Sequence, residues 1–234
     1  MIIGSTSGIG RALAELCIEQ GFRVGGVGRN NQALRQMHRA YPEHFVCQAA
    51  DLRKISDLQT RLNALLRKMG GMDICVVSSG IARKNPDLHF DIENDVLQTN
   101  VTGYASVLIW AANYFKKQHT GHLVGITSLA KFLGSPNPAY TASKAFESRY
   151  LDGLRLKLNP HNIIVTEIMP GFVRTPMTRD QSKMFWAITP EKAAHNILNV
   201  IKKKKNRAVI SLRWKPFYWL LPHIPYGILK RVVR

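Results

Sequence analysis

The first ten residues place the strongest constraint on the fold. They read M-I-I-G-S-T-S-G-I-G, with glycines at positions 4, 8 and 10 directly after a short apolar run. A helical pattern, R-A-L-A-E-L-C-I-E-Q, follows and stops at Gly21. A strand, a glycine turn and a helix suit a dinucleotide, because the glycines let the backbone approach a pyrophosphate and the helix N-terminus offers free N–H groups. Taken alone, the turn fits an ordinary strand–helix connection equally well.

Apolar strand patterns alternate with helical patterns along the chain. Strands are predicted at residues 1–3, 22–27, 44–49, 73–77, 122–127, 162–168 and 207–212, and helices at 91–117 and 138–158. Thr189, Pro190 and Glu191 are typical of a helix N-cap and first turn. The alternation predicts an α/β protein with a doubly wound, Rossmann-like parallel sheet covered on both faces. The first strand is shorter than the roughly five residues of a central strand, which fits either a start upstream of Met1 or a truncated strand.

At 234 residues the chain suits one domain with a substantial core. We expect a dinucleotide-binding and catalytic domain at 1–212 and a C-terminal tail at 213–234 that is not an independent domain.

Cys17, Cys47 and Cys75 lie in apolar patterns without a C-x-x-C motif, so reduced thiols in the cytoplasm are expected. The histidines show no ligand pattern, and no metal site is predicted. The longest apolar stretch falls short of the about 20 residues that a spanning helix needs, and no secretory signal is present.

Residues 128–144 read S-L-A-K-F-L-G-S-P-N-P-A-Y-T-A-S-K. Tyr140 and Lys144 are four apart on a predicted helix, so their Cβ atoms lie about 5–6 Å apart on one face. A fixed cation beside a phenol stabilises the phenolate, which suits Tyr140 to general acid/base work. Ser128 could hydrogen-bond the oxygen that Tyr140 protonates. A lone Y-x-x-x-K pair more often faces solvent, and the rest of the chain, beginning with the glycine turn about 130 residues earlier, favours the catalytic interpretation.

Together these motifs resemble the short-chain dehydrogenase/reductase family in its single-domain form, over roughly residues 2–212. Gly4-x-x-x-Gly8-x-Gly10 matches the family's glycine motif, N-V-T-G at 100–103 its N-V-x-G, and P-G-F-V-R-T at 170–175 the motif after its sixth strand. The resemblance implies a catalytic set of Asn100, Ser128, Tyr140 and Lys144. The expected cofactor contacts are Gly4, Ser5, Ser7, Gly8, Ile9, Gly10, Arg29, Asp51, Leu52, Ser79, Gly80, Tyr140, Lys144, Pro170, Gly171, Val173 and Thr175.

Two positions depart from the family pattern. Ile3 stands where the family has a threonine, and V-S-S-G at 77–80 stands where it has N-N-A-G. Gly80 is kept, but Ser78 and Ser79 cannot donate hydrogen bonds as asparagine amides do. The altered motif is the one feature that supports an alternative function, a cofactor-binding sensor or scaffold without efficient turnover.

The second predicted strand ends in V-G-G-V-G-R-N. Enzymes that prefer NAD usually place an acid at this strand end to bind the ribose 2′-hydroxyl. Here Gly28 occupies that position and Arg29 follows, and a guanidinium can pair bidentately with a 2′-phosphate. We therefore predict NADP(H) in preference to NAD(H). The alternative is a surface arginine that begins a helix.

The implied reaction is hydride transfer between nicotinamide and a carbonyl/alcohol pair. The segment after the P-G turn carries Met177, Met184, Phe185 and Trp186, which with Phe132 and Leu133 suggest a pocket for a small apolar substrate. The same residues fit a core or an oligomer contact equally well, and a homodimer or homotetramer is expected.

The net charge of +18 is concentrated at the C-terminal end, where residues 192–234 carry 11 Lys/Arg and no Asp/Glu. No nucleic-acid recognition motif accompanies the lysines at 202–205, so no nucleic acid is expected as a partner.

In the tail, basic residues flank an aromatic run broken by prolines. The aromatic residues are Trp214, Phe217, Tyr218, Trp219 and Tyr226, and the basic ones are Arg213, Lys215, Lys230, Arg231 and Arg234. This pattern suits peripheral binding to an anionic inner membrane surface, whereas the alternative is a tail packed on the enzyme or across a dimer contact.

Overall fold

The computed structural model describes residues 1–179, 184–225, 227–228 and 230. Its centre is a sheet of seven strands in the order β3-β2-β1-β4-β5-β6-β7, and every neighbouring pair is parallel. The strands are β1 (Ile2–Ile3), β2 (Val24–Gly28), β3 (Phe45–Ala49), β4 (Ile74–Val77), β5 (Gly121–Ile126), β6 (Ile163–Met169) and β7 (Arg207–Val209). The predicted doubly wound α/β fold is confirmed.

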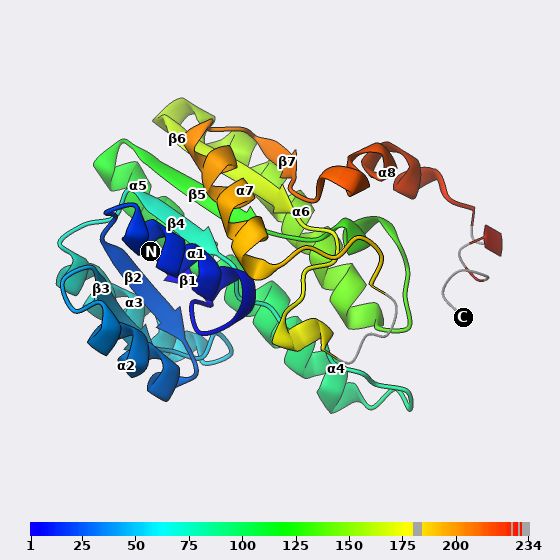
Figure 1. Cartoon of the computed structure of the whole chain (residues 1–234), viewed down its shortest axis with the longest axis horizontal. Helices are drawn as coiled ribbons and strands as arrows, with labels where there is room; N and C mark the ends of the chain where they lie inside the picture. The colour runs from blue at the N-terminus through cyan, green and yellow to red at the C-terminus, as the bar shows by residue number, and fades with distance from the viewer. Residues whose placement is uncertain (180–183, 226, 229, 231–234) are drawn as a thin grey trace.

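Helices cover both faces of the sheet (Figure 1). One layer holds α1 (Gly8–Glu19), α2 (Asn31–Ala40) and α7 (Pro190–Lys202). The other holds α3 (Ile55–Met69), α5 (Tyr104–Gln118) and α6 (Pro138–Leu158), and α4 (Phe90–Leu97) packs against α6. Thr189 caps α7 as predicted, since its hydroxyl accepts the Lys192 N–H at 3.2 Å.

Strand side chains alternate between the two cores, as the two-residue period of a strand requires. Ile2 and Val76 pack with α1 and α7, whereas Ile3 and Val77 pack with α3, α5 and α6. All four are buried. A sheet covered on both faces explains why the central strands are almost wholly apolar.

The predicted helix at 91–117 is wrong in one respect, because a π-helical segment, Gln98–Gly103, separates α4 from α5. Gly103 packs so closely on the Leu52 carbonyl that an added Cβ would lie 2.6 Å from its oxygen. The Thr99 hydroxyl donates to the Asp95 carbonyl at 2.9 Å. π-Bulges occur frequently at functional sites, and this one carries Asn100.

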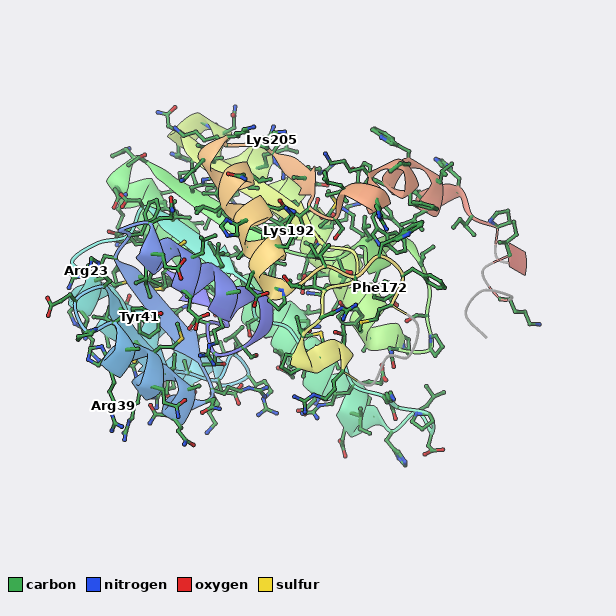
Figure 2. All side chains as sticks on the ribbon, in the orientation of Figure 1. Arg23, Arg39, Tyr41, Phe172, Lys192 and Lys205 are labelled. Carbon is green, nitrogen blue, oxygen red and sulfur yellow. The ribbon has the colours of Figure 1, made fainter. Side chains whose placement is uncertain are left out.

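The tail begins with a 3₁₀ turn (Leu212–Trp214), continues as α8 (Lys215–Leu220) and ends in a second 3₁₀ turn (Leu221–His223). The predicted last strand, 207–212, therefore ends earlier, at Val209. A third core joins Trp214, Phe217 and Leu221 to Leu129 and Met169 of the main domain. Figure 2 shows Phe172 on the side of the molecule that carries the tail.

Tyr226, Arg231 and Arg234 of the tail lie outside the described residues. Among the helices that the structure does describe, none is long and apolar enough to cross a membrane.

Candidate active site

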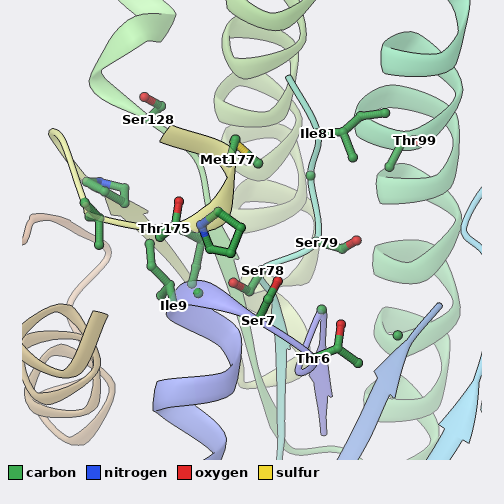
Figure 3. Close-up of a pocket in the computed structure, with 18 of the residues that line it drawn as sticks. Thr6, Ser7, Ile9, Ser78, Ser79, Ile81, Thr99, Ser128, Thr175 and Met177 are labelled. Atoms are coloured by element: carbon green, nitrogen blue, oxygen red, sulfur yellow. The ribbon is translucent and has the colours of Figure 1, made fainter. Parts of the chain in front are cut away.

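A cavity of about 310 Å³ opens where the carboxyl ends of the central strands meet the start of α1 (Figure 3). The expected site residues that line it are Gly4, Ser7, Gly8, Ile9, Arg29, Asp51, Leu52, Ser79, Gly80, Ser128, Tyr140, Lys144, Pro170, Gly171, Val173 and Thr175. Ser5, Gly10 and Asn100 do not line it and support it from behind. Open α/β sheets bind their ligands at this edge.

The glycine turn between β1 and α1 depends on two close backbone contacts. Gly4 has a φ of +92°, and a Cβ there would lie 2.7 Å from the Ser79 nitrogen. A Cβ on Gly10 would lie 2.1 Å from the Gly4 carbonyl oxygen. Both positions therefore exclude every other residue. Ser5 completes the turn by donating its hydroxyl to the Val27 carbonyl at 3.3 Å.

The start of α1 fits the phosphates of a dinucleotide. No side chain caps it, although Ser7 occupies the N-cap position, and its first turn contains no acid. Its N–H groups and the positive end of its dipole are therefore available to an anion in the cavity. Figure 3 shows Ser7, Ser78 and Thr175 around this point.

Ser128, Tyr140 and Lys144 reach the same cavity from two segments. Ser128 follows β5 and caps a 3₁₀ turn, where its Oγ accepts the Ala130 N–H at 3.1 Å. A serine hydroxyl that accepts in this way still has its own hydrogen to donate. Tyr140 lies in the first turn of α6 and Lys144 in the next, with the ammonium 5.7 Å from the centre of the phenol ring.

Asn100 is fully buried and fixes the chain beside the cavity. Its Oδ1 accepts the Ile81 N–H at 2.8 Å, and its Nδ2 donates to the Ile81 carbonyl at 2.9 Å and to Ser143 Oγ at 3.0 Å. Gly80 lies between this amide and the lysine, because a Cβ on Gly80 would be 3.2 Å from Lys144 Nζ. The side chain of Asn100 thus positions the backbone next to Lys144.

Asp51 lies at the opposite end of the cavity in a network of charges. Arg53 donates to both of its carboxylate oxygens and, at 2.8 Å, to Asp95. Hydrogen bonding to Arg53 holds the pKa of Asp51 below its ordinary value, so the carboxylate stays ionised. Arg29 also lines the cavity at this end, directly after β2.

The P-G-F-V-R-T segment closes the cavity over the glycine turn. A Cβ on Gly8 would lie 3.1 Å from the Thr175 methyl group, so the two segments touch. Thr178 secures this arrangement by accepting the Thr175 N–H at 3.0 Å and donating to the Val173 carbonyl at 2.8 Å.

Sequence reasoning missed several lining residues. They are Thr6, Gly28, Asn30, Ala50, Ser78, Ile81, Thr99, Ile126, Thr127, Pro176, Met177 and Thr178, of which Met177 was expected only as a substrate contact. Most adjoin a recognised motif in the chain, and that adjacency was the available signal.

The other residues suggested for an apolar pocket do not line the cavity. Phe132 and Leu133 pack on the third core, where the Phe132 ring lies 5.5 Å from that of Tyr218. Trp186 lies 5.6 Å from Trp214 of the tail. Phe132, Leu133 and Trp186 thus make packing contacts here, whereas Phe185 is largely exposed.

A family model described as short chain dehydrogenase matches residues 1–185. An uncharacterized oxidoreductase from Myxococcus xanthus is 35% identical over 184 residues, which cover 76% of this chain and 73% of that protein. A short-chain dehydrogenase from Sphingobium yanoikuyae in complex with NADPH superposes with a TM-score of 0.80 at 22% identity, covering 96% and 95% of the two chains. A 3-ketoacyl-(acyl-carrier-protein) reductase from Brucella melitensis complexed with NADH gives a TM-score of 0.80 at 23% identity, covering 89% and 93%.

The fold and the extent of the family match define the class of protein. The chain belongs to the short-chain dehydrogenase/reductase family. It is accordingly an NAD(P)-dependent oxidoreductase.

The close contact at Gly10 leads to a first prediction. Gly10→Ala is expected to lower the free energy of unfolding by about 1–3 kcal/mol, because the methyl group forces backbone atoms apart. It should also weaken cofactor binding, measured by fluorescence titration with NADPH. Gly153→Ala on α6 is the matched control, since nothing lies within 4 Å of its added Cβ. An unchanged melting temperature and affinity for Gly10→Ala would contradict the contact.

Proposed function

We propose that this enzyme transfers a hydride between NADP(H) and the carbonyl/alcohol carbon of a small apolar substrate. The observation that carries the proposal is that Ser128, Tyr140 and Lys144 line one cavity together with the glycine turn of α1. A proton donor, a hydrogen-bond donor and a cation at the same cavity are the groups that carbonyl reduction requires.

A nicotinamide held at this cavity would supply the hydride for reduction or accept it in oxidation. Tyr140 gives its phenolic proton to the substrate oxygen during reduction and takes it back during oxidation. Ser128 donates its free hydroxyl hydrogen to the same oxygen and so holds the carbonyl in place. Lys144, whose ammonium lies beside the phenol ring, stabilises the phenolate that proton transfer leaves behind.

The remaining site residues have binding and positioning roles in this proposal. Asn100 holds the backbone at Ile81, next to Lys144. The start of α1 would hold the pyrophosphate, and Asp51 with Leu52 would lie at the adenine. Pro170, Gly171, Val173 and Thr175 would enclose the nicotinamide end, since Thr175 touches the turn at Gly8.

The preference for NADP(H) rests on the end of β2. Gly28 leaves no carboxylate there, and a Cβ at this position would lie 2.5 Å from the Thr6 methyl group. Arg29 lines the cavity beside the start of α2, whose first turn contains no acid. Asn30 caps that helix by accepting the Ala33 N–H at 3.0 Å. A guanidinium and the positive end of a helix dipole with no acid in its first turn both favour a 2′-phosphate.

Met177 supports an apolar substrate. It lines the cofactor cavity and also the wider opening beside it, where Ala82, Ile92 and Pro176 add apolar surface. The rest of that opening is polar, and its other lining residues are Arg83, Lys84, Asp91, Asp95 and Asn137. Methionine adapts its shape to irregular ligands.

The second prediction tests the proton donor. Tyr140→Phe is expected to reduce NADPH consumption with aldehydes and ketones to below a few per cent of the wild-type kcat. The affinity for NADPH should change little, because the substitution removes a single hydroxyl group and the other cofactor contacts remain. Tyr150→Phe makes the same chemical change in the same helix, where Tyr150 stacks on Phe146, and should keep full turnover. Substantial turnover by Tyr140→Phe would show that Tyr140 is not the proton donor, whereas the absence of turnover in the wild type would support the sensor or scaffold alternative.

The third prediction concerns cofactor choice. Arg29→Ala should weaken NADPH binding by ~1.5–3 kcal/mol, the range for a hydrogen bond to a charged group, and leave NADH binding nearly unchanged. The control is Arg39→Ala, which changes an exposed arginine at the end of α2, the helix that follows Arg29 (Figure 2). Equal losses for the two cofactors, or a wild-type preference for NADH, would contradict the assignment.

We further propose that the tail binds an anionic membrane surface through its outer face. Its inner face packs on the enzyme. Packing on the enzyme and the proposed membrane binding therefore involve opposite sides of α8. Trp219 and Leu220 are 75% and 60% exposed, and the neighbouring Lys215 is also exposed. Exposed aromatic and aliphatic side chains beside cations suit the lipid headgroup region.

The fourth prediction tests that surface. The full chain should float with anionic liposomes at low salt and less at high salt, because each cation near the lipid contributes about 1 kcal/mol. The double change Trp219→Ser and Leu220→Ser should abolish flotation and leave the melting temperature unchanged. Leu156→Ser, at a leucine that is 80% exposed on α6, is the control and should still float. If the wild type stays in solution, the outer face does not bind membrane.

A further inference from the structure

Lys144 makes an ion pair that no recognised motif predicts. Its Nζ lies 2.9 Å from Oε1 and 2.8 Å from Oε2 of Glu147, three residues further along α6. Lys144 is 5% exposed and Glu147 is fully buried. Acidic side chains are almost never fully buried without a partner. The ammonium therefore lies between the Glu147 carboxylate and the ring of Tyr140.

No other described cation neutralises Glu147. On β6, Glu167 is also fully buried, but its own cations are Lys131 at 2.7 Å and Arg207 of β7 at 3.2 Å. On α5, the buried Tyr104 hydroxyl has no hydrogen-bond partner in the described structure, and its pKa is raised by burial and by the two nearby glutamates.

The remaining polar neighbours of α6 provide no second cation for Glu147. Glu93 of α4 accepts the Ala139 N–H at the start of α6 and hydrogen-bonds Asn85. The amide of Asn100 is occupied by Ile81 and Ser143. Lys144 is thus the single ion-pair partner of Glu147 among the described residues.

The pair also determines how firmly Lys144 keeps its proton. Burial works to lower the pKa of Lys144, but the charges of Glu147 and Tyr140 and the hydrogen bonds that Lys144 donates to Glu147 outweigh it, so that pKa is raised. Burial raises the pKa of Glu147 to about 7, and the lysine only partly opposes it. Because both carboxylate oxygens contact the ammonium, we take the pair as ionised above neutral pH. Without the carboxylate, burial would favour a neutral lysine.

We infer that Glu147 is a positioning residue of this enzyme: it holds the Lys144 ammonium protonated beside Tyr140 and so determines the pH range of proton transfer. The inference rests on the proposed roles of Tyr140 and Lys144. A buried charge is retained only when its partner compensates it.

The test is a pH titration of tyrosinate absorbance in the enzyme saturated with NADP⁺. Subtracting the spectra of the Tyr140→Phe variant isolates the signal of Tyr140. The same difference is then measured for Glu147→Gln, with the double variant Glu147→Gln/Tyr140→Phe as the reference. The titration midpoint of Tyr140 should move up by about one pH unit or more, which is a roughly tenfold loss of tyrosinate at a given pH. The reason is that an uncharged Lys144 no longer stabilises the phenolate. The pH at which alcohol oxidation reaches half its maximum should rise in parallel.

Glu167→Gln is the matched control. It makes the same change at an equally buried glutamate that pairs with Lys131 and not with Lys144. Its titration midpoint should equal that of the wild type even if its stability falls. Equal shifts in the two variants, no shift in Glu147→Gln, or a shift to lower pH would overturn the inference.

Removing one partner of a buried ion pair leaves the other charge uncompensated and is strongly destabilising, so Glu147→Gln can fail to fold. Glu147→Asp then takes its place, because it keeps the charge and lengthens the contact with Lys144. It should shift the midpoint in the same direction by a smaller amount, and an unshifted midpoint would overturn the inference. The titration needs no substrate and can therefore be done on an enzyme that shows no turnover. A wild type that consumes no NADPH would contradict the proposed function, whereas only the titration midpoints decide the role of Glu147.

Discussion

The close approach of α1 to β1 is the contact on which the rest of the structure depends. The space at Gly10 is filled by the Gly4 carbonyl, and the space at Gly4 by the backbone at Ser79. These contacts bring the start of α1 and the end of β4 to one point at the carboxyl edge of the sheet. Because all strands are parallel, β2, β5 and β6 end at the same edge, and the segments that follow them begin there. The cavity follows from this geometry.

Burial on both faces of the sheet limits how charge can be used at that edge. Several ionised groups in and behind the cavity wall are paired: Asp51 with Arg53, Lys144 with Glu147, and Lys131 with Glu167. In a poorly solvated site each partner fixes the position of the other, since an unpaired charge is costly there. Groups held in this way need little rearrangement during a reaction.

The tail extends the same packing to the surface. The residues on its inner side are spaced as one face of a helix and join the core that contains Leu129 and Met169. Trp214 fits against Gly171, where a Cβ would lie 2.6 Å from the indole ring. The tail therefore contacts the segment that closes the cofactor cavity.

Much of the fold and the site follows from local patterns in the sequence. Strand and helix alternation determines the doubly wound sheet, and α6 runs over the predicted 138–158 because a proline in the first turn and a continuous helical pattern define it. The glycine turn and the spacing of Tyr140 and Lys144 are likewise local, so their motifs could be recognised without coordinates.

Tertiary structure alone decided the remaining features. Glu147 looks like an ordinary helix charge in sequence, and only packing of α6 against α5 and β6 buries it. The π segment at Asn100 depends on a contact between Gly103 and Leu52, which are far apart in the chain. The division of the tail into a packed and an exposed face depends on its docking. Propensity and spacing act within a turn or two, whereas burial and pairing depend on which distant segments meet, and the sequence by itself does not state that.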